Sequence, residues 1–258
     1  MISDYSHQRL YDSVSLVPRV GDRSDNELCV MSLVALLAGE RHTDRPQAAC
    51  PVIATFAIKV NDGIDCDTRQ SLKPFAPRIV GTRDGLARGR AWVLVNGILG
   101  EVLPRWAHDF GHTISAELLG KLRVGSQSFD AQELHDLYAV VRQEAAHLGL
   151  DRGRVNDIRY LLRACERGSD ELVANSCASI LSDFARHPAS PEDSSWYWNK
   201  AIELIDRICD VGDGPALAGA QIEHHANTQA QRIRAQETYG PVLQKLFGAR
   251  KQRSKTDA

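Results

Sequence analysis

Apolar residues recur along this chain at the three- and four-residue spacing of amphipathic helices, and no segment shows the strict alternation typical of a half-buried strand. The first apolar segment, residues 27 to 38, is apolar on nearly all sides, which predicts a helix buried on most of its faces. Asp25 and Asn26 precede it as candidate N-caps, and Gly39 follows it as a stop. We therefore expect a polar N-terminal arm at residues 1 to 24, followed by a buried helix.

Proline and glycine positions predict the next two helices. Pro51 stands in the first turn of an apolar segment, where a missing N–H costs nothing, and residues 61 to 63 close that segment. A short helix is predicted to begin at Asp67 and to end at Pro74. A turn-rich connector then leads to the next helix.

A longer helix is predicted from about residue 86 to about residue 103 by its apolar spacing. Gly89, Gly97 and Gly100 each weaken it by about 1 kcal/mol relative to alanine. Such small residues would let another helix approach closely. Pro104 is expected either to begin a new helical turn or to kink the old helix.

No proline occurs between Pro104 and Pro188, which predicts a run of successive helices. Asp130 is the expected cap of one helix, and Ser169 and Asp170 of another. A polar helix is also predicted over residues 217 to 237, with a short piece through Phe247. The apolar positions expected inside four of these helices are Leu134, Leu137, Val141 and Leu148; Val155, Ile158, Leu161, Leu162 and Cys165; Leu172, Val173, Ile180, Leu181 and Phe184; and Trp198, Ile202, Ile205 and Cys209.

These elements predict an all-α fold, an irregular multi-helix bundle of about nine helices. A candidate boundary between two helical subdomains lies near residues 123 to 130. It would separate an apolar N-terminal helical domain, residues 25 to 125, from an amphipathic C-terminal helical domain, residues 126 to 248. Residues 249 to 258 form a basic tail that we expect to be disordered.

Composition adds that the chain is an ordinary soluble protein without a strong electrostatic field. Of its 258 residues, 43% are hydrophobic and 25% charged, and the net charge is −2. The longest apolar run, LCVMSLVALLA, is shorter than the about 20 residues of a membrane span, so we expect no membrane insertion. Nucleic acid would bind only through the basic tail, whose cations are Arg250, Lys251, Arg253 and Lys255.

The six cysteines form no C-x-x-C pair, and the first residues, MISDYSHQRLYDS, hold no apolar run of a secretory signal. We therefore expect reduced thiols and a cytoplasmic location.

The segment HDFGH contains the first candidate site: His108, Asp109 and His112. It is similar to the HD-x-G-H motif of the HD phosphohydrolases, which implies a divalent metal bound by the His-Asp pair and hydroxide attack on phosphorus. That family also uses an earlier histidine and a later aspartate. The nearest upstream histidine is the distant His42, and no downstream aspartate stands out. The alternative is a helix end, with Gly111 as the stop.

Two polar loops are the second candidate, as binding surfaces set on apolar helices. Asn61 and Asp62 stand at the end of the helix that begins at Pro51, where C-terminal capping is the alternative role. The loop at residues 39 to 46 is otherwise a solvated turn, and its candidate binding residues are Glu40, Arg41, His42 and Asp44.

Three segments, CVMSLVALLAGERHTDRP, CPVIATFAIKVND and LKPFAPRIVGTRDG, resemble a group of bacterial and bacteriophage proteins of unassigned function. The resemblance covers about 100 of the 258 residues, and it implies no known chemistry. In that group the helix after G-T generally lacks a His-Asp pair. The matching positions are Ala38, Gly39 and Glu40; Asp44 and Pro46; Pro51, Val52 and Ile53; Asn61 and Asp62; and Gly81 and Thr82.

The chain has no phosphate-binding Walker loop, no dinucleotide G-x-G-x-x-G after a strand, no G-x-S-x-G and no H-E-x-x-H. We therefore expect a non-enzymatic protein without a cofactor, which binds another protein or its own copy. The alternative from another class is a metal-dependent phosphohydrolase centred on His108 and Asp109.

Overall fold

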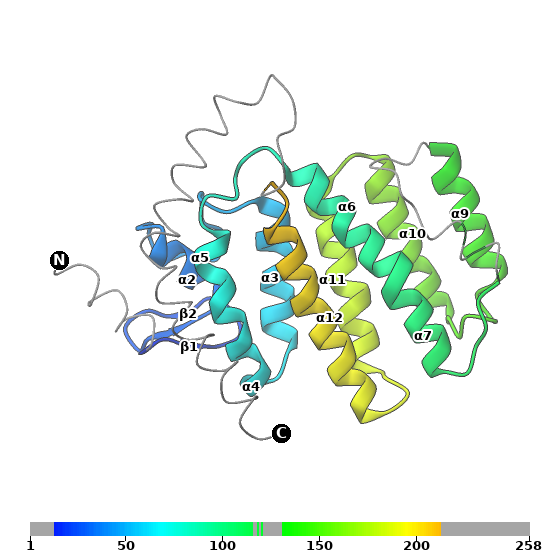
Figure 1. The fold of residues 1–258 in the computed structure, drawn as a ribbon, viewed down its shortest axis with the longest axis horizontal. Helices are drawn as coiled ribbons and strands as arrows, with labels where there is room; N and C mark the ends of the chain where they lie inside the picture. Colours follow the sequence, from blue (N-terminus) through cyan, green and yellow to red (C-terminus); the bar gives the residue numbers. More distant parts are fainter. Residues whose placement is uncertain (1–12, 116–117, 119, 121–130, 213–258) are drawn as a thin grey trace, which may run out of the picture. The chain divides into compact units, whose positions relative to one another are not determined.

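The computed structural model describes residues 13–115, 118, 120 and 131–212, which are mostly helical (Figure 1). Within these residues the chain has eight helices of seven residues or more, rather than nine, and three strands of two residues each. The prediction of a helical fold is confirmed in its main feature and corrected by the small sheet. The described chain divides into two compact units, one with the residues up to Cys50 and Asp65–Asp84, the other with Pro51–Ile64 and the residues from Gly85 onward.

The first unit combines the sheet with one regular helix and several short ones. In the sheet β3 lies between the other two strands, parallel to β1 and antiparallel to β2. Leu16 and Leu28 are paired and buried, so the sheet contributes to the core of this unit. Its elements are β1 (Ser15–Leu16), β2 (Gly21–Asp22), β3 (Glu27–Leu28), α2 (Val30–Leu37), α4 (Cys66–Arg69), the 3₁₀ segment η1 (Gln70–Phe75) and α5 (Ala76–Ile79).

The start of the first predicted helix is wrong. Residues 27 and 28 form β3, and α2 begins at Val30 behind an N-cap at Cys29. Asn26, an expected cap, takes a positive φ of 57° and turns the chain into the strand. The stop at Gly39 is confirmed, because its φ of 72° cannot continue a helix.

The expected end at Pro74 is also wrong. Asp65 caps α4 through its carboxylate, which accepts hydrogen bonds from two backbone N–H groups. Pro74 lies within η1, and the chain continues into α5. A proline is tolerated there because its missing N–H interrupts a short 3₁₀ turn instead of a long helical ladder.

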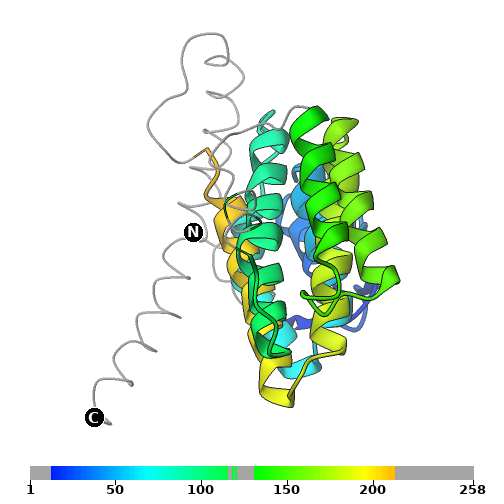
Figure 2. The ribbon, with the colours of Figure 1, turned by 90° about the vertical axis from the view of Figure 1, so that its right-hand side faces the viewer.

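The second unit is a bundle of long helices around α11 (Figures 1 and 2). Helix α11 contacts α3, α6, α10 and α12, and nine of its residues are buried. Figure 2 shows these helices running alongside one another. The elements are α3 (Pro51–Gly63), α6 (Ala87–Gly97), the π-helical segment η2 (Ile98–Val102), α7 (Leu103–Asp109), α9 (Ala131–Gln143), α10 (Arg152–Glu166), α11 (Asp170–Arg186) and α12 (Pro191–Cys209).

Close helix approach at a glycine of α6 is confirmed. A Cβ atom added to Gly97 would lie 2.4 Å from Cδ2 of Leu204 in α12. Pro104 stands in the first turn of α7, so it begins a new turn after the π-helical segment. The predicted helix through Leu148 is shorter than expected: α9 ends at Gln143, and Leu148 is buried in the turns that follow.

Several predictions fall outside the described residues. They are residues 1 to 12 of the arm, the boundary near residues 123 to 130, the cap at Asp130, the helix at 217 to 237, the piece through Phe247 and the basic tail. Residues 13 to 24 of the predicted arm contain β1 and β2. No helix among the described residues has the length and apolar character needed to cross a membrane.

Candidate functional site

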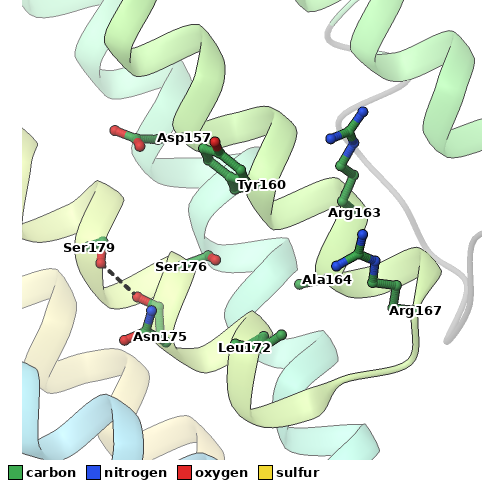
Figure 3. A pocket seen from close by; sticks show the side chains of 9 residues that line it. All are labelled: Asp157, Tyr160, Arg163, Ala164, Arg167, Leu172, Asn175, Ser176 and Ser179. Carbon is green, nitrogen blue, oxygen red and sulfur yellow. Dashed lines mark hydrogen bonds between the residues drawn. The ribbon is translucent and has the colours of Figure 1, made fainter.

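A concave surface lies between α10 and α11, and we call it the α10–α11 groove (Figure 3). Its volume is about 320 Å³, which falls at the lower end of the range of ligand sites. Both helices belong to the second unit. Its lining residues are Asp157, Tyr160, Arg163, Ala164, Arg167, Leu172, Asn175, Ser176 and Ser179.

A tight turn holds the two helices side by side. The N–H of Gly168 donates to the Cys165 carbonyl and the N–H of Ser169 donates to the Ala164 carbonyl, which closes the C-terminus of α10. Gly168 has a φ of 66°, and α11 begins two residues later, at Asp170. At the other end of α10, the Asp151 carboxylate caps the helix by accepting a hydrogen bond from the N–H of Arg154.

Two large apolar side chains at the groove are exposed to solvent. Tyr160 is 56% exposed and Leu172 is 50% exposed. Phe110 is the third large hydrophobic residue in the described chain that is exposed to this extent. Two of the three therefore line one concave surface, whereas scattered single apolar residues on a surface need no explanation.

The exposure of Leu172 corrects its predicted place inside α11. Its neighbour Val173 is 1% exposed and belongs to the buried apolar stripe of α11. Successive residues of a helix point about 100° apart, so Leu172 lies beside the stripe rather than in it.

Arginines follow one face of α10 at intervals of four residues: Arg159, Arg163 and Arg167. No ion pair joins Arg163 or Arg167 to any of the residues that the structure describes. The Nε of Arg159 is buried and has no hydrogen-bond partner among the described residues. Its guanidinium carbon lies 5.5 Å from the centroid of the Tyr160 ring. By contrast, Arg154 of the same helix pairs with both Asp151 and Asp183.

Arg163 in the last turn of α10 and Arg167 at its C-cap fit the helix dipole, which favours cations at a C-terminus. This interaction uses no donor of the guanidinium group. Figure 3 shows Arg163 and Arg167 toward one end of the groove, with Tyr160 and then Asp157 further back along α10. The groove is therefore cationic at one end.

The opposite end of the groove is polar and hydrogen-bonded. Burial raises the pKa of Asp157, and the neighbouring carboxylates of Asp183 and Asp151 raise it further. Ser179 Oγ accepts a hydrogen bond from Lys59 Nζ at 2.6 Å and donates to the Asn175 carbonyl at 2.9 Å (Figure 3).

The predicted histidine–aspartate site lies elsewhere, at the end of α7. Asp109 is buried, with 3% of its side chain exposed, whereas the side chain of His108 is 84% exposed. Arg105 Nε donates to Oδ1 of Asp109 at 2.5 Å, and the Tyr197 hydroxyl donates to Oδ2 at 3.0 Å. His112 follows the helix and packs against Gly149, away from a shared centre with the pair.

The alternative role for this segment, a helix end, is confirmed. Helix α7 stops at Asp109, and Gly111 has a φ of 71°. The N–H of His112 donates to the Ala107 carbonyl at 2.7 Å, which closes the helix. Among the described residues no three His, Cys, Asp or Glu side chains converge where they could hold a metal ion. The phosphohydrolase hypothesis stays a prediction.

The predicted binding loops fall in different units. In the first unit, the Glu40 carboxylate accepts hydrogen bonds from the N–H groups of Gln47 and Ala48, at 2.7 and 2.8 Å, and so shapes its own loop. Arg41 and His42 in that loop are exposed, and Asp44 is half-buried.

The other predicted pair belongs to the second unit, at the end of α3. There Asn61 is buried and Asp62 is exposed. Binding at either loop stays a prediction.

No protein-family model, curated protein or solved structure matches this chain. The resemblance of its N-terminal segments to bacterial and bacteriophage proteins therefore stays an expectation.

Proposed function

We propose that this protein acts by binding another protein in the α10–α11 groove. The observation that carries the proposal is the exposure of Tyr160 and Leu172 around one concavity. Aromatic and aliphatic side chains at the rim of a pocket are typical anchors of protein interfaces, and covering them removes apolar surface from water.

Catalysis in this groove has less support than protein binding. A serine hydrolase needs a nucleophile with a base and with donors for the developing oxyanion. Ser179 lies in the middle of α11, where neighbouring backbone N–H groups are used by the helix, and its own proton goes to the Asn175 carbonyl. The thiol of Cys165, in α10, has its pKa raised to about 12 by burial, which removes the thiolate needed for attack.

The test replaces the exposed apolar side chains. Immobilised wild-type protein, the double variant Tyr160→Ser/Leu172→Ser and the control Phe110→Ser are each exposed to lysate from cells that express the chain. We expect proteins captured by the wild type and the control to fall at least about tenfold on the groove variant, a loss of at least about 1.4 kcal/mol of binding free energy. Circular dichroism should be the same for all three proteins.

Equal capture by the three proteins would contradict the proposal. Sedimentation velocity on the purified wild type separates a second copy from a different protein as the partner. A dimer that the groove variant disrupts and the control retains would identify the partner as the same chain.

A further inference from the structure

We infer that the α10–α11 groove selects an acidic segment of its partner, in which an apolar residue stands beside carboxylates. This inference rests on the proposed function and names the chemistry of the partner. It is carried by the charge and order of the side chains along α10.

The cationic end of the groove has unused binding capacity. Arg163 and Arg167 line the groove and are exposed, and neither forms an ion pair with a residue that the structure describes. A guanidinium donates two parallel hydrogen bonds to a carboxylate, a geometry that few other side-chain groups match. Carboxylates supplied by a partner would satisfy these donors.

The spacing fixes how the carboxylates must be placed. Residues four apart on a helix lie about 6 Å apart along its axis. Two carboxylates on successive turns of a helical segment, or two residues apart in an extended one, have about the same separation. Arg163 and Arg167 can therefore engage two acids of one short segment.

The remaining lining residues determine in which direction the partner's segment would run along the groove. Tyr160 lies on α10 about one turn before Arg163, and Leu172 lines the α11 side of the groove, so the two provide apolar surface for a side chain of the partner (Figure 3). Asp157 lies beyond Tyr160 and would repel a carboxylate. The acids should thus lie at the Arg167 end, with the apolar residue next to them and a neutral or basic residue near Asp157.

A nucleic acid is the other polyanion that arginines bind, and the groove fits it less well. Phosphates would be repelled by Asp157, and the aliphatic Leu172 gives a base no ring to stack on. The net charge of the whole chain, −2, gives no general attraction for nucleic acid.

The experiment selects peptides without assuming their charge. A random peptide library displayed on phage is selected on the full-length protein, and sequences that also bind Tyr160→Ser/Leu172→Ser are removed. We expect the remaining peptides to contain an apolar residue next to two or more acids. Fluorescence polarisation with the strongest synthetic peptide then measures affinity.

Charge reversal tests the arginines directly. Arg163→Glu/Arg167→Glu should weaken binding of the acidic peptide at least about tenfold. A peptide with lysines in place of the acids should bind this variant better than the wild type does. The matched control is Arg152→Glu/Arg186→Glu, which makes the same change in net charge at exposed arginines of α10 and α11 outside the groove and should bind as the wild type. Circular dichroism checks that each variant is folded.

Each other outcome has a distinct meaning. Groove-dependent peptides that are neutral or basic would overturn the inference on charge and leave the proposed function standing. If no peptide depends on the groove, both are overturned. Binding of single-stranded oligouridylate that Arg163→Glu/Arg167→Glu abolishes would also overturn both, because the groove would then be a nucleic-acid site.

Discussion

The phenol of Tyr197, in α12, donates a hydrogen bond to the buried carboxylate of Asp109, at the end of α7, with an Oη–Oδ2 distance of 3.0 Å. Burial raises the pKa of Tyr197, and the Asp109 carboxylate raises it further, so the phenol stays protonated as a donor. Arg105 completes the contact by bridging Asp109 and Asp193. An aspartate that begins as a candidate metal ligand is thus occupied by protein donors that join two helices.

We predict that Tyr197→Phe lowers the free energy of unfolding by about 1–3 kcal/mol, because the buried carboxylate of Asp109 loses one of its donors. Urea denaturation followed by circular dichroism measures the change. Tyr160→Phe is the matched control, since Tyr160 is 56% exposed. An equal effect of the two substitutions would show that the Tyr197–Asp109 contact contributes nothing.

The same segment gives a prediction that separates the structural role from the phosphohydrolase hypothesis. His108→Ala should change the free energy of unfolding by less than about 0.5 kcal/mol, because most of this side chain is in solvent. Titration calorimetry with manganese, on the wild type and on this variant, tests the metal-binding role. Stoichiometric binding by the wild type that His108→Ala abolishes would favour the hydrolase.

Apolar spacing was sufficient to predict the long helices. The stripe from Val155 to Cys165 and the helix that opens at Pro51 both lie where local sequence places them. The small sheet was not predictable in this way. Its strands have two residues each, too few for an alternating pattern, and β1 pairs with β3 over a separation of twelve residues. Asn26 suits both a helix cap and a left-handed turn, and the strand pairing decides between them.

The α10–α11 groove was missed for a different reason. The sequence contained a signal, since Arg159, Arg163 and Arg167 recur every four residues and Tyr160 lies off the apolar stripe of its helix. Such a row is also typical of a solvated face. Only the position of α11 shows that Leu172 and Tyr160 line one concavity. The histidine–aspartate pair, which local sequence made conspicuous, proved to be a helix end.

Glycines of α6 allow a prediction about packing. Gly97→Ala should lower the free energy of unfolding by about 1–3 kcal/mol, because its Cβ would overlap Leu204, a fully buried side chain. Gly89→Ala, in the same helix, should instead stabilise by up to about 1 kcal/mol, since its Cβ would meet Val211 at an ordinary 3.4 Å. Thermal denaturation compares the two. Stabilisation by both would mean that α12 moves away from Gly97 at little cost.

The last prediction concerns the pH dependence of stability at two carboxylates of α10, Asp157 within the helix and Asp151 at its N-cap. Asp157 has a pKa raised above the ordinary 3.8 by burial and by its acidic neighbours, so the folded state holds its proton more tightly than the unfolded state does. Ionisation therefore lowers stability as the pH rises from about 3.8 through the folded pKa, and the loss persists above it. Asp157→Asn should stabilise the protein at about pH 7 and not at about pH 3.

Asp151, at the N-cap of α10, provides a control of opposite sign. Its pKa is lowered by a hydrogen bond from the backbone N–H of Arg154, so its ionised form stabilises the fold at neutral pH, and that contribution is lost as the pH falls through the folded pKa. Asp151→Asn should therefore destabilise at about pH 7 and have little effect at about pH 3. Melting temperatures of the two variants, each relative to the wild type, should diverge as the pH rises; parallel curves would show that the environments of these carboxylates do not differ as their contacts indicate.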